Sequence, residues 1–127
     1  MIDSFDDVTI LFADIAGFTK YSSSVTALEV VDMLRELFTE FDKLCKNFDV
    51  YKLYTIGDCY VVLGFLDANA RNPDKETLNV VLMACSMLDI IEEVKGRIDF
   101  GELNMRIGIH RVKKICSFKS LLIFYYS

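Results

Sequence analysis

Two aspartates, Asp14 and Asp58, are the residues of this chain best placed to do chemistry. Asp14 follows the apolar run of residues 8–13, and Asp58 ends the turn Thr55-Ile-Gly-Asp58 between two further β-like runs. Carboxylates at the tips of adjacent strands can hold a divalent cation, because hard cations take oxygen ligands. Asp14 also precedes a helix start, where backbone N–H groups favour anions. The pair therefore predicts a divalent metal site beside a nucleoside triphosphate.

Each of these residues also has an ordinary structural interpretation. Asp14 alone could cap the next helical turn, and Asp58 alone could be a simple Gly-Asp hairpin tip. Thr19 could contact phosphate or could serve only as a helix cap. His110, the single histidine, fits a strand end better than a ligand or base, and Cys59 fits an inward position on the hairpin. The metal interpretation depends on both aspartates together with their flanking residues.

Composition narrows the class of protein and its partners. The 127 residues are 53% hydrophobic, which predicts one domain with its own core rather than disorder. The net charge of −5 argues against nucleic acid as a partner, since such proteins normally carry a basic patch. A polyphosphate remains compatible, because a divalent cation reverses the local charge.

The cysteines and the apolar runs predict the cellular compartment of the protein. The four cysteines form no Cys-x-x-Cys pair, so a structural zinc site is not expected and reduced cytosolic thiols are. Residues 1–7 are acidic and do not resemble a signal peptide. The longest apolar runs are shorter than the roughly 20 residues that cross a bilayer. Membrane attachment would therefore come only through a larger parent protein.

Hydrophobic periodicity predicts the element order strand, helix, hairpin, helix, strand. A capping box at Thr26-Ala-Leu-Glu29 opens the first helix, which ends near Asn47. The other expected elements are a strand at 8–13, a short turn or single helical turn at 17–24, hairpin strands at 50–55 and 59–65, a loop at 66–75, a helix at 76–95 stopped by Gly96, and a strand at 103–109. This order favours an α+β, ferredoxin-like βαββαβ sandwich with both helices on one sheet face.

The same periodicity predicts which helix residues face the core. In the first helix these are Val30, Leu34, Leu37, Phe41, Leu44 and Phe48. In the second helix they are Val81, Ala84, Cys85, Leu88 and Ile91.

Three segments resemble a known family. Leu11-Phe-Ala-Asp-Ile-Ala-Gly-Phe-Thr19 and Tyr54-Thr-Ile-Gly-Asp-Cys-Tyr-Val-Val62 resemble the two metal-site motifs of class III adenylyl and guanylyl cyclase catalytic domains. Residues 103–110 resemble the strand that follows, and the hairpin is similar to those of protist guanylyl cyclases. The resemblance implies a lyase of intracellular signalling that converts GTP, or less readily ATP, to the 3′,5′-cyclic nucleotide and pyrophosphate.

The resemblance also implies roles for single residues. Asp14 and Asp58 would be the catalytic metal ligands for two Mg²⁺ or Mn²⁺ ions, with the backbone of Ile15 assisting. Amides of Gly17, Phe18 and Thr19 would face the phosphates. Family active sites lie between two cyclase domains, so a second domain would complete the site as a heterodimer or tandem half.

The chain departs from the family pattern at two places. Tyr54 stands where the family has a lysine for adenine or a glutamate for guanine, so this chain resembles the metal-donating half. After His110 the family continues with Thr-Gly and a long segment that carries an Asn/Arg motif, whereas this chain continues Arg111-Val-Lys. We expect residues 1–110 to form a partial cyclase domain, incomplete at its C-terminus, and 111–127 an atypical tail from truncation, a frame change or an unspliced intron.

Two other functions remain open at this stage. The chain could be a non-catalytic dimerisation or regulatory half, or an inactive fragment, which Tyr54 and the missing C-terminal segment favour. A two-metal nucleotidyl-transfer palm also pairs acids on a hairpin, although the segment Phe12-Ala-Asp-Ile-Ala-Gly-Phe-Thr19 favours the cyclase. We expect the domain to lie in the cytoplasm. It could also belong to a membrane-anchored parent protein and face the cytoplasm there.

Overall fold

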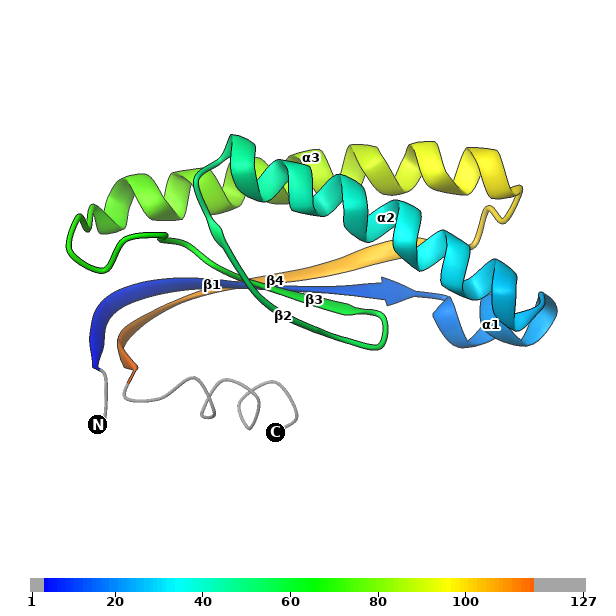
Figure 1. Cartoon of the computed structure of the whole chain (residues 1–127), viewed down its shortest axis with the longest axis horizontal. Coiled ribbons are helices and arrows are strands. Elements are labelled where there is room, and N and C mark those ends of the chain that lie inside the picture. Colours follow the sequence, from blue (N-terminus) through cyan, green and yellow to red (C-terminus); the bar gives the residue numbers. More distant parts are fainter. Residues whose placement is uncertain (1–3, 116–127) are drawn as a thin grey trace.

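Seven elements make up residues 4–115, the part of the chain that the computed structural model describes. In chain order they are β1 (Phe5–Ala16), α1 (Phe18–Ser24), α2 (Ala27–Asn47), β2 (Tyr51–Ile56), β3 (Cys59–Leu63), α3 (Pro73–Ile98) and β4 (Asn104–Ile115). The strands form one antiparallel sheet in the order β2-β3-β1-β4. Helices α2 and α3 lie on one face of this twisted sheet (Figure 1). The predicted α+β sandwich is confirmed.

Strand β1 is central and buried on both faces. Its residues alternate between two apolar clusters, because successive side chains of a strand point to opposite faces. Leu11, Ala13 and Ile15 belong to the cluster under the helices. Ile10 and Phe12 belong to the cluster on the other face, where Cys59 is also buried as predicted.

Helix α2 begins and packs largely as its sequence predicts. The Thr26 hydroxyl accepts a hydrogen bond from the Glu29 amide at 3.2 Å, so the predicted cap is present. Leu37 and Phe41 are fully buried, and the other four predicted core residues are partly buried against the same cluster.

Helix α3 differs from its prediction at both ends and in its buried face. It begins at Pro73 with Asn72 as cap and runs through Gly96 to Ile98, where Asp99 takes a left-handed conformation. Of the predicted core residues, Ala84 and Ile91 are buried, whereas Val81, Leu88 and Cys85 are exposed. The helix is apolar on two faces, so its sequence alone did not determine which face meets the sheet. The buried apolar residues of α3 are Val80, Met83, Ala84, Met87, Ile91 and Val94.

Strands β1 and β4 are both longer than predicted. Strand β4 continues past His110 to Ile115 and pairs with the start of β1, with Ile115 opposite Phe5. Opposite charges favour this extension, because Lys114 pairs with Asp6 across the two strands. The predicted strand end at residue 109 is therefore wrong. Residues 116–127 lie outside the described residues, so the domain boundary after His110 stays a prediction.

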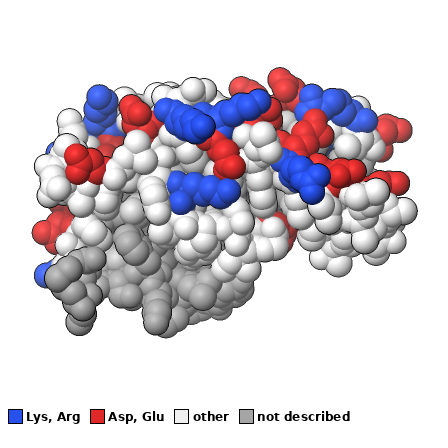
Figure 2. All heavy atoms as spheres, viewed as in Figure 1, with Lys and Arg blue, Asp and Glu red and all other residues white. Residues whose placement is uncertain are grey.

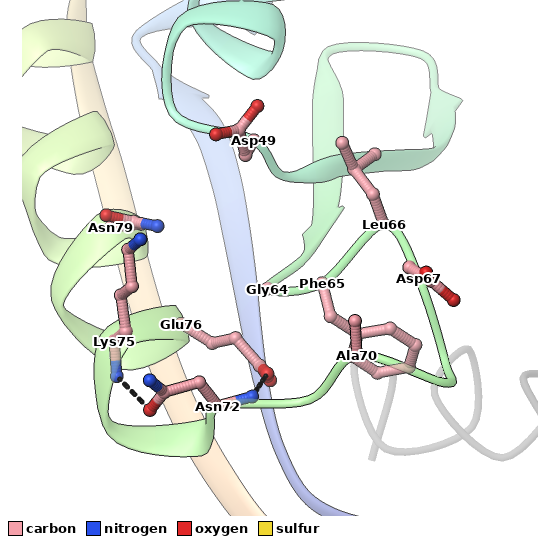
Figure 3. A pocket seen from close by; sticks show the side chains of 10 residues that line it. All are labelled: Asp49, Gly64, Phe65, Leu66, Asp67, Ala70, Asn72, Lys75, Glu76 and Asn79. Carbon is pink, nitrogen blue, oxygen red and sulfur yellow. Dashed lines mark hydrogen bonds between the residues drawn. The ribbon is translucent and has the colours of Figure 1, made fainter.

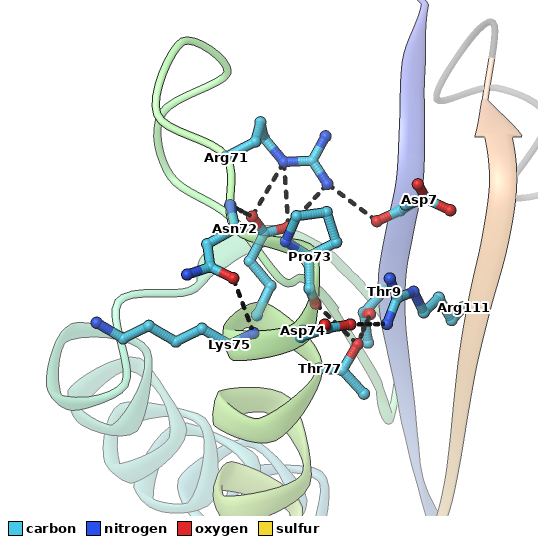
Figure 4. A network of polar contacts seen from close by, with 10 residues as sticks. Asp7, Thr9, Arg71, Asn72, Pro73, Asp74, Lys75, Thr77 and Arg111 are labelled. Atoms are coloured by element: carbon cyan, nitrogen blue, oxygen red, sulfur yellow. Dashed lines mark hydrogen bonds and ion pairs between the residues drawn. The ribbon is translucent and has the colours of Figure 1, made fainter.

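A polar network attaches the start of α3 to Asp7 and Thr9 in the first half of β1 (Figure 4). Glu76 is buried, with 9% of its side chain exposed, and it accepts three hydrogen bonds from Arg71 at 2.8–3.1 Å. It also accepts from the Asn72 amide at 2.6 Å. Arg71 further donates to the carbonyl of Asp7 at 3.0 Å. The buried charge is thus paired and hydrogen-bonded, as a buried carboxylate requires.

The surface agrees with the acidic composition. Lys and Arg side chains are interspersed with Asp and Glu on the face shown in Figure 2, rather than gathered in a basic surface. Within residues 4–115, no helix combines the length and apolar character that crossing a bilayer would require.

Candidate metal and nucleotide site

Strand register brings the two aspartates together. Asp14 lies near the end of β1, opposite Cys59 of β3. Asp58 immediately precedes Cys59 in the two-residue turn between β2 and β3, where Gly57 adopts a positive φ of 56°. This conformation is accessible to glycine at little cost. The hairpin tip therefore holds the Asp58 carboxyl beside that of Asp14, as the spacing of the two motifs predicted.

The electrostatics of the pair reflect two carboxylates in contact. The pKa of Asp58 is raised to about 6, first by burial and then by the hydrogen bond and the negative charge of Asp14. The backbone amides of Asp58 and Ile15 oppose the shift. The negative charge of Asp14 at short range disfavours ionisation of Asp58. A cation at this position would remove that repulsion.

This shift predicts a pH-dependent stability effect at Asp58. A raised pKa in the folded state means that stability is fully present below about pH 4 and falls as the pH rises through about 6. Asp58→Asn should therefore stabilise the metal-free chain at about pH 8 and change little at about pH 4. Because Asp58 is only partly buried, solvent screening reduces the gain to about 1 kcal/mol.

Urea denaturation in the presence of a chelator would measure this difference. Asp89→Asn, at an exposed carboxylate on α3, is the matched control and should leave stability unchanged at both pH values. Equal stability of wild type and Asp58→Asn at the higher pH would contradict the assigned repulsion.

Arg106 is a site residue that the sequence did not identify as one. It lies opposite Asp14 on β4, and its Nη2 donates to Asp14 Oδ2 at 2.8 Å. The Arg106 side chain is 71% exposed, whereas that of Asp14 is 24% exposed. The arginine thus remains accessible at the rim while the carboxylate sits deeper. Only the register between β1 and β4 would have placed Arg106 beside Asp14. That register depends on pairing between residues far apart in the sequence.

One open cavity of about 470 Å³ gathers these groups. A volume of this order is within the range of ligand pockets. Every predicted metal and phosphate residue lines it, together with two cations that the prediction did not include. The lining residues are Asp14, Ile15, Gly17, Phe18, Thr19, Lys20, Asp58 and Arg106.

The turn after β1 shows whether Asp14 or Thr19 caps the next helix. Gly17 is the N-cap of α1 with φ of 82°, and no side chain caps this helix. Asp14 and Thr19 therefore do not act as caps. A Cβ on Gly17 would also lie 2.9 Å from the carbonyl oxygen of Glu102, so the turn needs glycine both for its conformation and for its close packing.

Tyr54 and His110 lie outside this cavity. Tyr54 pairs with Val61 and packs against the apolar cluster on the sheet face away from the helices. His110 lies opposite Ile10 within β4, with its ring 6.2 Å from that of Phe12. It is therefore inside a strand rather than at a strand end.

The donor set fits a hard divalent cation. Residues 4–115 contain no group of three or more His, Cys, Asp or Glu side chains that could hold a metal ion. Two carboxylates, with a backbone carbonyl and phosphate oxygens to add, match the way Mg²⁺ binds through one or two carboxylates plus substrate. Asp14, Asp58 and the Ile15 backbone are the groups available to hold it.

A second, smaller cavity lies at the opposite end of β1, between the start of α3 and the segment after β3 (Figure 3). Its volume is about 270 Å³, and Phe65, Asn72, Lys75, Glu76 and Asn79 are among its lining residues. Glu76 is already paired with Arg71. No residue predicted for metal or phosphate binding lies in this cavity.

Known proteins resemble this chain in sequence. The family model for the adenylate and guanylate cyclase catalytic domain matches residues 1–120. Guanylate cyclase soluble subunit alpha-1 of Rattus norvegicus is 44% identical over 107 residues, covering 84% of this chain and 15% of that protein. A guanylate cyclase of Toxoplasma gondii is 47% identical over 109 residues, covering 83% of this chain and 2% of that protein.

Solved structures of cyclase domains are also similar to this chain. The guanylate cyclase domain of RhGC from Catenaria anguillulae, in complex with GTP, has a TM-score of 0.73 at 29% identity and covers 88% of this chain. The dimeric guanylyl cyclase domain of RhoGC from Blastocladiella emersonii has a TM-score of 0.75 at 29% identity and covers 89%. This chain spans 59% and 60% of those two chains. It therefore belongs to the adenylate and guanylate cyclase catalytic-domain family, whose members are lyases that make cyclic nucleotides, and it comprises part of that domain.

Proposed function

We propose that this chain supplies the metal-binding half of a purine nucleotide cyclase, which converts GTP or ATP to the 3′,5′-cyclic nucleotide and pyrophosphate. The observation that carries the proposal is the accessible cavity that Asp14 and Asp58 line together. Asp14 does not cap the helix that follows it, because Gly17 is the N-cap of α1. GTP is favoured over ATP because the named relatives are guanylate cyclases.

In this proposal the carboxylates bind the metal ions, and the neighbouring turn binds the phosphates. Asp14, Asp58 and the Ile15 backbone would hold two Mg²⁺ or Mn²⁺ ions. When bound, such ions lower the cost of deprotonating the ribose 3′-hydroxyl and neutralise charge on the leaving pyrophosphate. Amides of Gly17, Phe18 and Thr19 would orient the β- and γ-phosphates. A cation on Asp14 would compete with Arg106 for that carboxylate, leaving the guanidinium to the triphosphate.

A second cyclase domain would complete the site. Tyr54 cannot replace the lysine or glutamate that reads a purine in this family, and its ring is packed in an apolar cluster. The base contacts and the groups that steady developing charge would therefore come from the partner domain. The Blastocladiella domain has been solved both as a non-canonical dimer and as a monomer, so a partner domain here is inferred from Tyr54.

Mixing experiments test this function. The chain would be incubated with Mn²⁺ and either GTP or ATP, alone and together with a purine-reading cyclase half. Product in the mixture only would support the proposal, and the preferred nucleotide would identify the base. Product from the chain alone would refute the need for a partner.

The alternative is a dimerisation or regulatory half without chemistry. It is favoured by Tyr54, which packs in an apolar cluster and does not line the cavity. Under this alternative the chain would bind a cyclase partner, yet no mixture would form product with either nucleotide.

The relatives include both soluble and receptor proteins, so the chain could belong to either kind of parent protein. One relative is a soluble cyclase subunit, and another, 41% identical over 109 residues, is atrial natriuretic peptide receptor 2 of Homo sapiens. We infer a cytoplasmic catalytic position in either kind of parent, with any membrane anchor outside the segment described.

A further inference from the structure

We propose that Lys20 is a phosphate-binding residue of this site, held by Glu102 in the nucleotide-free chain and transferred to the triphosphate on binding. The inference rests on the proposed function and adds a residue to it. Lys20 is the third residue of α1 and lines the same cavity as Asp14 and Asp58. Its Nζ lies 2.5 Å from Glu102 Oε2, and the two side chains are 68% and 61% exposed.

Packing of the α3–β4 connection fixes the position of this ion pair. The carbonyl of Glu102 lies against Gly17, so the backbone that carries Glu102 touches the turn that carries the expected phosphate contacts. The rings of Phe100 and Tyr21 pack edge to face with centroids 5.3 Å apart. Leu103 is fully buried. The Glu102 side chain therefore lies beside Lys20 because the connection is anchored on both sides.

The charges of the cavity favour an exchange of partners. Both of its cations form ion pairs with carboxylates, Arg106 with Asp14 and Lys20 with Glu102. An exposed pair such as Lys20–Glu102 stabilises the fold by only about 0–1 kcal/mol, so little is lost when it opens. A phosphate oxygen offers the lysine a charge-assisted hydrogen bond. Glu102 does not line the cavity, so opening the pair leaves it in solvent rather than against the ligand.

Calorimetry with inorganic triphosphate and Mn²⁺ on the full chain tests the proposal directly. Lys20→Met should weaken triphosphate binding by about 5-fold, and Lys20→Arg should restore most of it. Glu102→Gln should tighten binding by about 2-fold, because it removes the competitor for Lys20. In the background of Lys20→Met, Glu102→Gln should have a smaller effect.

The matched control is Lys43→Met. Lys43 is similarly exposed and forms an i,i+3 ion pair with Glu40 at 2.9 Å on α2, outside the cavity. It should leave triphosphate binding unchanged, and thermal melting should show that both methionine variants fold as stably as wild type.

The outcomes separate this inference from the proposed function. If Lys20→Met and Lys43→Met bind Mn²⁺ and triphosphate as tightly as wild type, the role of Lys20 is overturned while the metal site stands. If binding depends on Lys20 but not on Mn²⁺ or Asp14, the metal-based function fails and Lys20 remains a phosphate contact. If wild type binds no triphosphate, both fail.

Discussion

Replacing Asp14 or Asp58 by alanine is expected to abolish cyclic nucleotide formation in the assembled pair of cyclase domains, while dimerisation persists. Each change removes one of the two carboxylates in contact at the cavity, and with it an oxygen ligand for the cations. Loss of transition-state charge stabilisation of this kind costs about 10²- to 10³-fold in rate. Turnover of GTP with Mn²⁺ measures the effect, and size-exclusion chromatography measures dimerisation.

Asp89→Ala provides the control, because Asp89 is an exposed carboxylate on α3 outside the cavity. This variant should keep wild-type turnover and dimerisation. The two site variants should also lose Mn²⁺ binding in the chain alone, measured by calorimetry. Mn²⁺-dependent activity retained by Asp14→Ala or Asp58→Ala would remove the assigned role.

Glu76→Ala should produce the largest loss of stability, about 3 kcal/mol in the free energy of unfolding. The substitution removes the acceptor of four hydrogen bonds. It also leaves the guanidinium of Arg71, whose side chain is 17% exposed, without its carboxylate. An uncompensated charge in a low-dielectric position costs more than the pair contributed. Urea denaturation followed by circular dichroism would measure the change.

The matched control is Asp32→Ala, which removes an exposed i,i+3 pair with Arg35 at 3.9 Å on α2. Its cost should stay below about 0.5 kcal/mol. A loss at Glu76 no greater than that at Asp32 would contradict the structural role of the network. Because Glu76 and Arg71 do not line the cavity that contains Asp14, Mn²⁺ affinity of the folded fraction should not change.

The parts predicted well from sequence are those determined by neighbouring residues. The capping box at Thr26 opens α2 because its donor and acceptor are three residues apart. Gly57 and Asp58 form the hairpin tip because the turn requires a positive φ at one position. Asp14 and Gly17 line the same cavity because they lie in one short motif.

The parts predicted poorly depend on contacts between distant residues. Helix α3 has apolar side chains on two faces, so periodicity selected Val81 and Leu88 although the sheet buries Val80 and Met87. Arg106 became a site residue only because β4 pairs beside Asp14. Lys20 and Glu102 meet because the α3–β4 connection packs on α1. None of these pairings has a local sequence signature.

The β1–β3 pairing that places Asp14 opposite Cys59 has a consequence for how the chain matures. A slip of one residue between these strands would turn one aspartate to the opposite face. If Asp14 and Asp58 hold metal ions as proposed, the ions would bind only molecules whose hairpin has docked correctly, and mass action would draw the population toward that form. Mn²⁺ would thus act as a folding template, raising the yield of correctly assembled chains during renaturation before any nucleotide arrives.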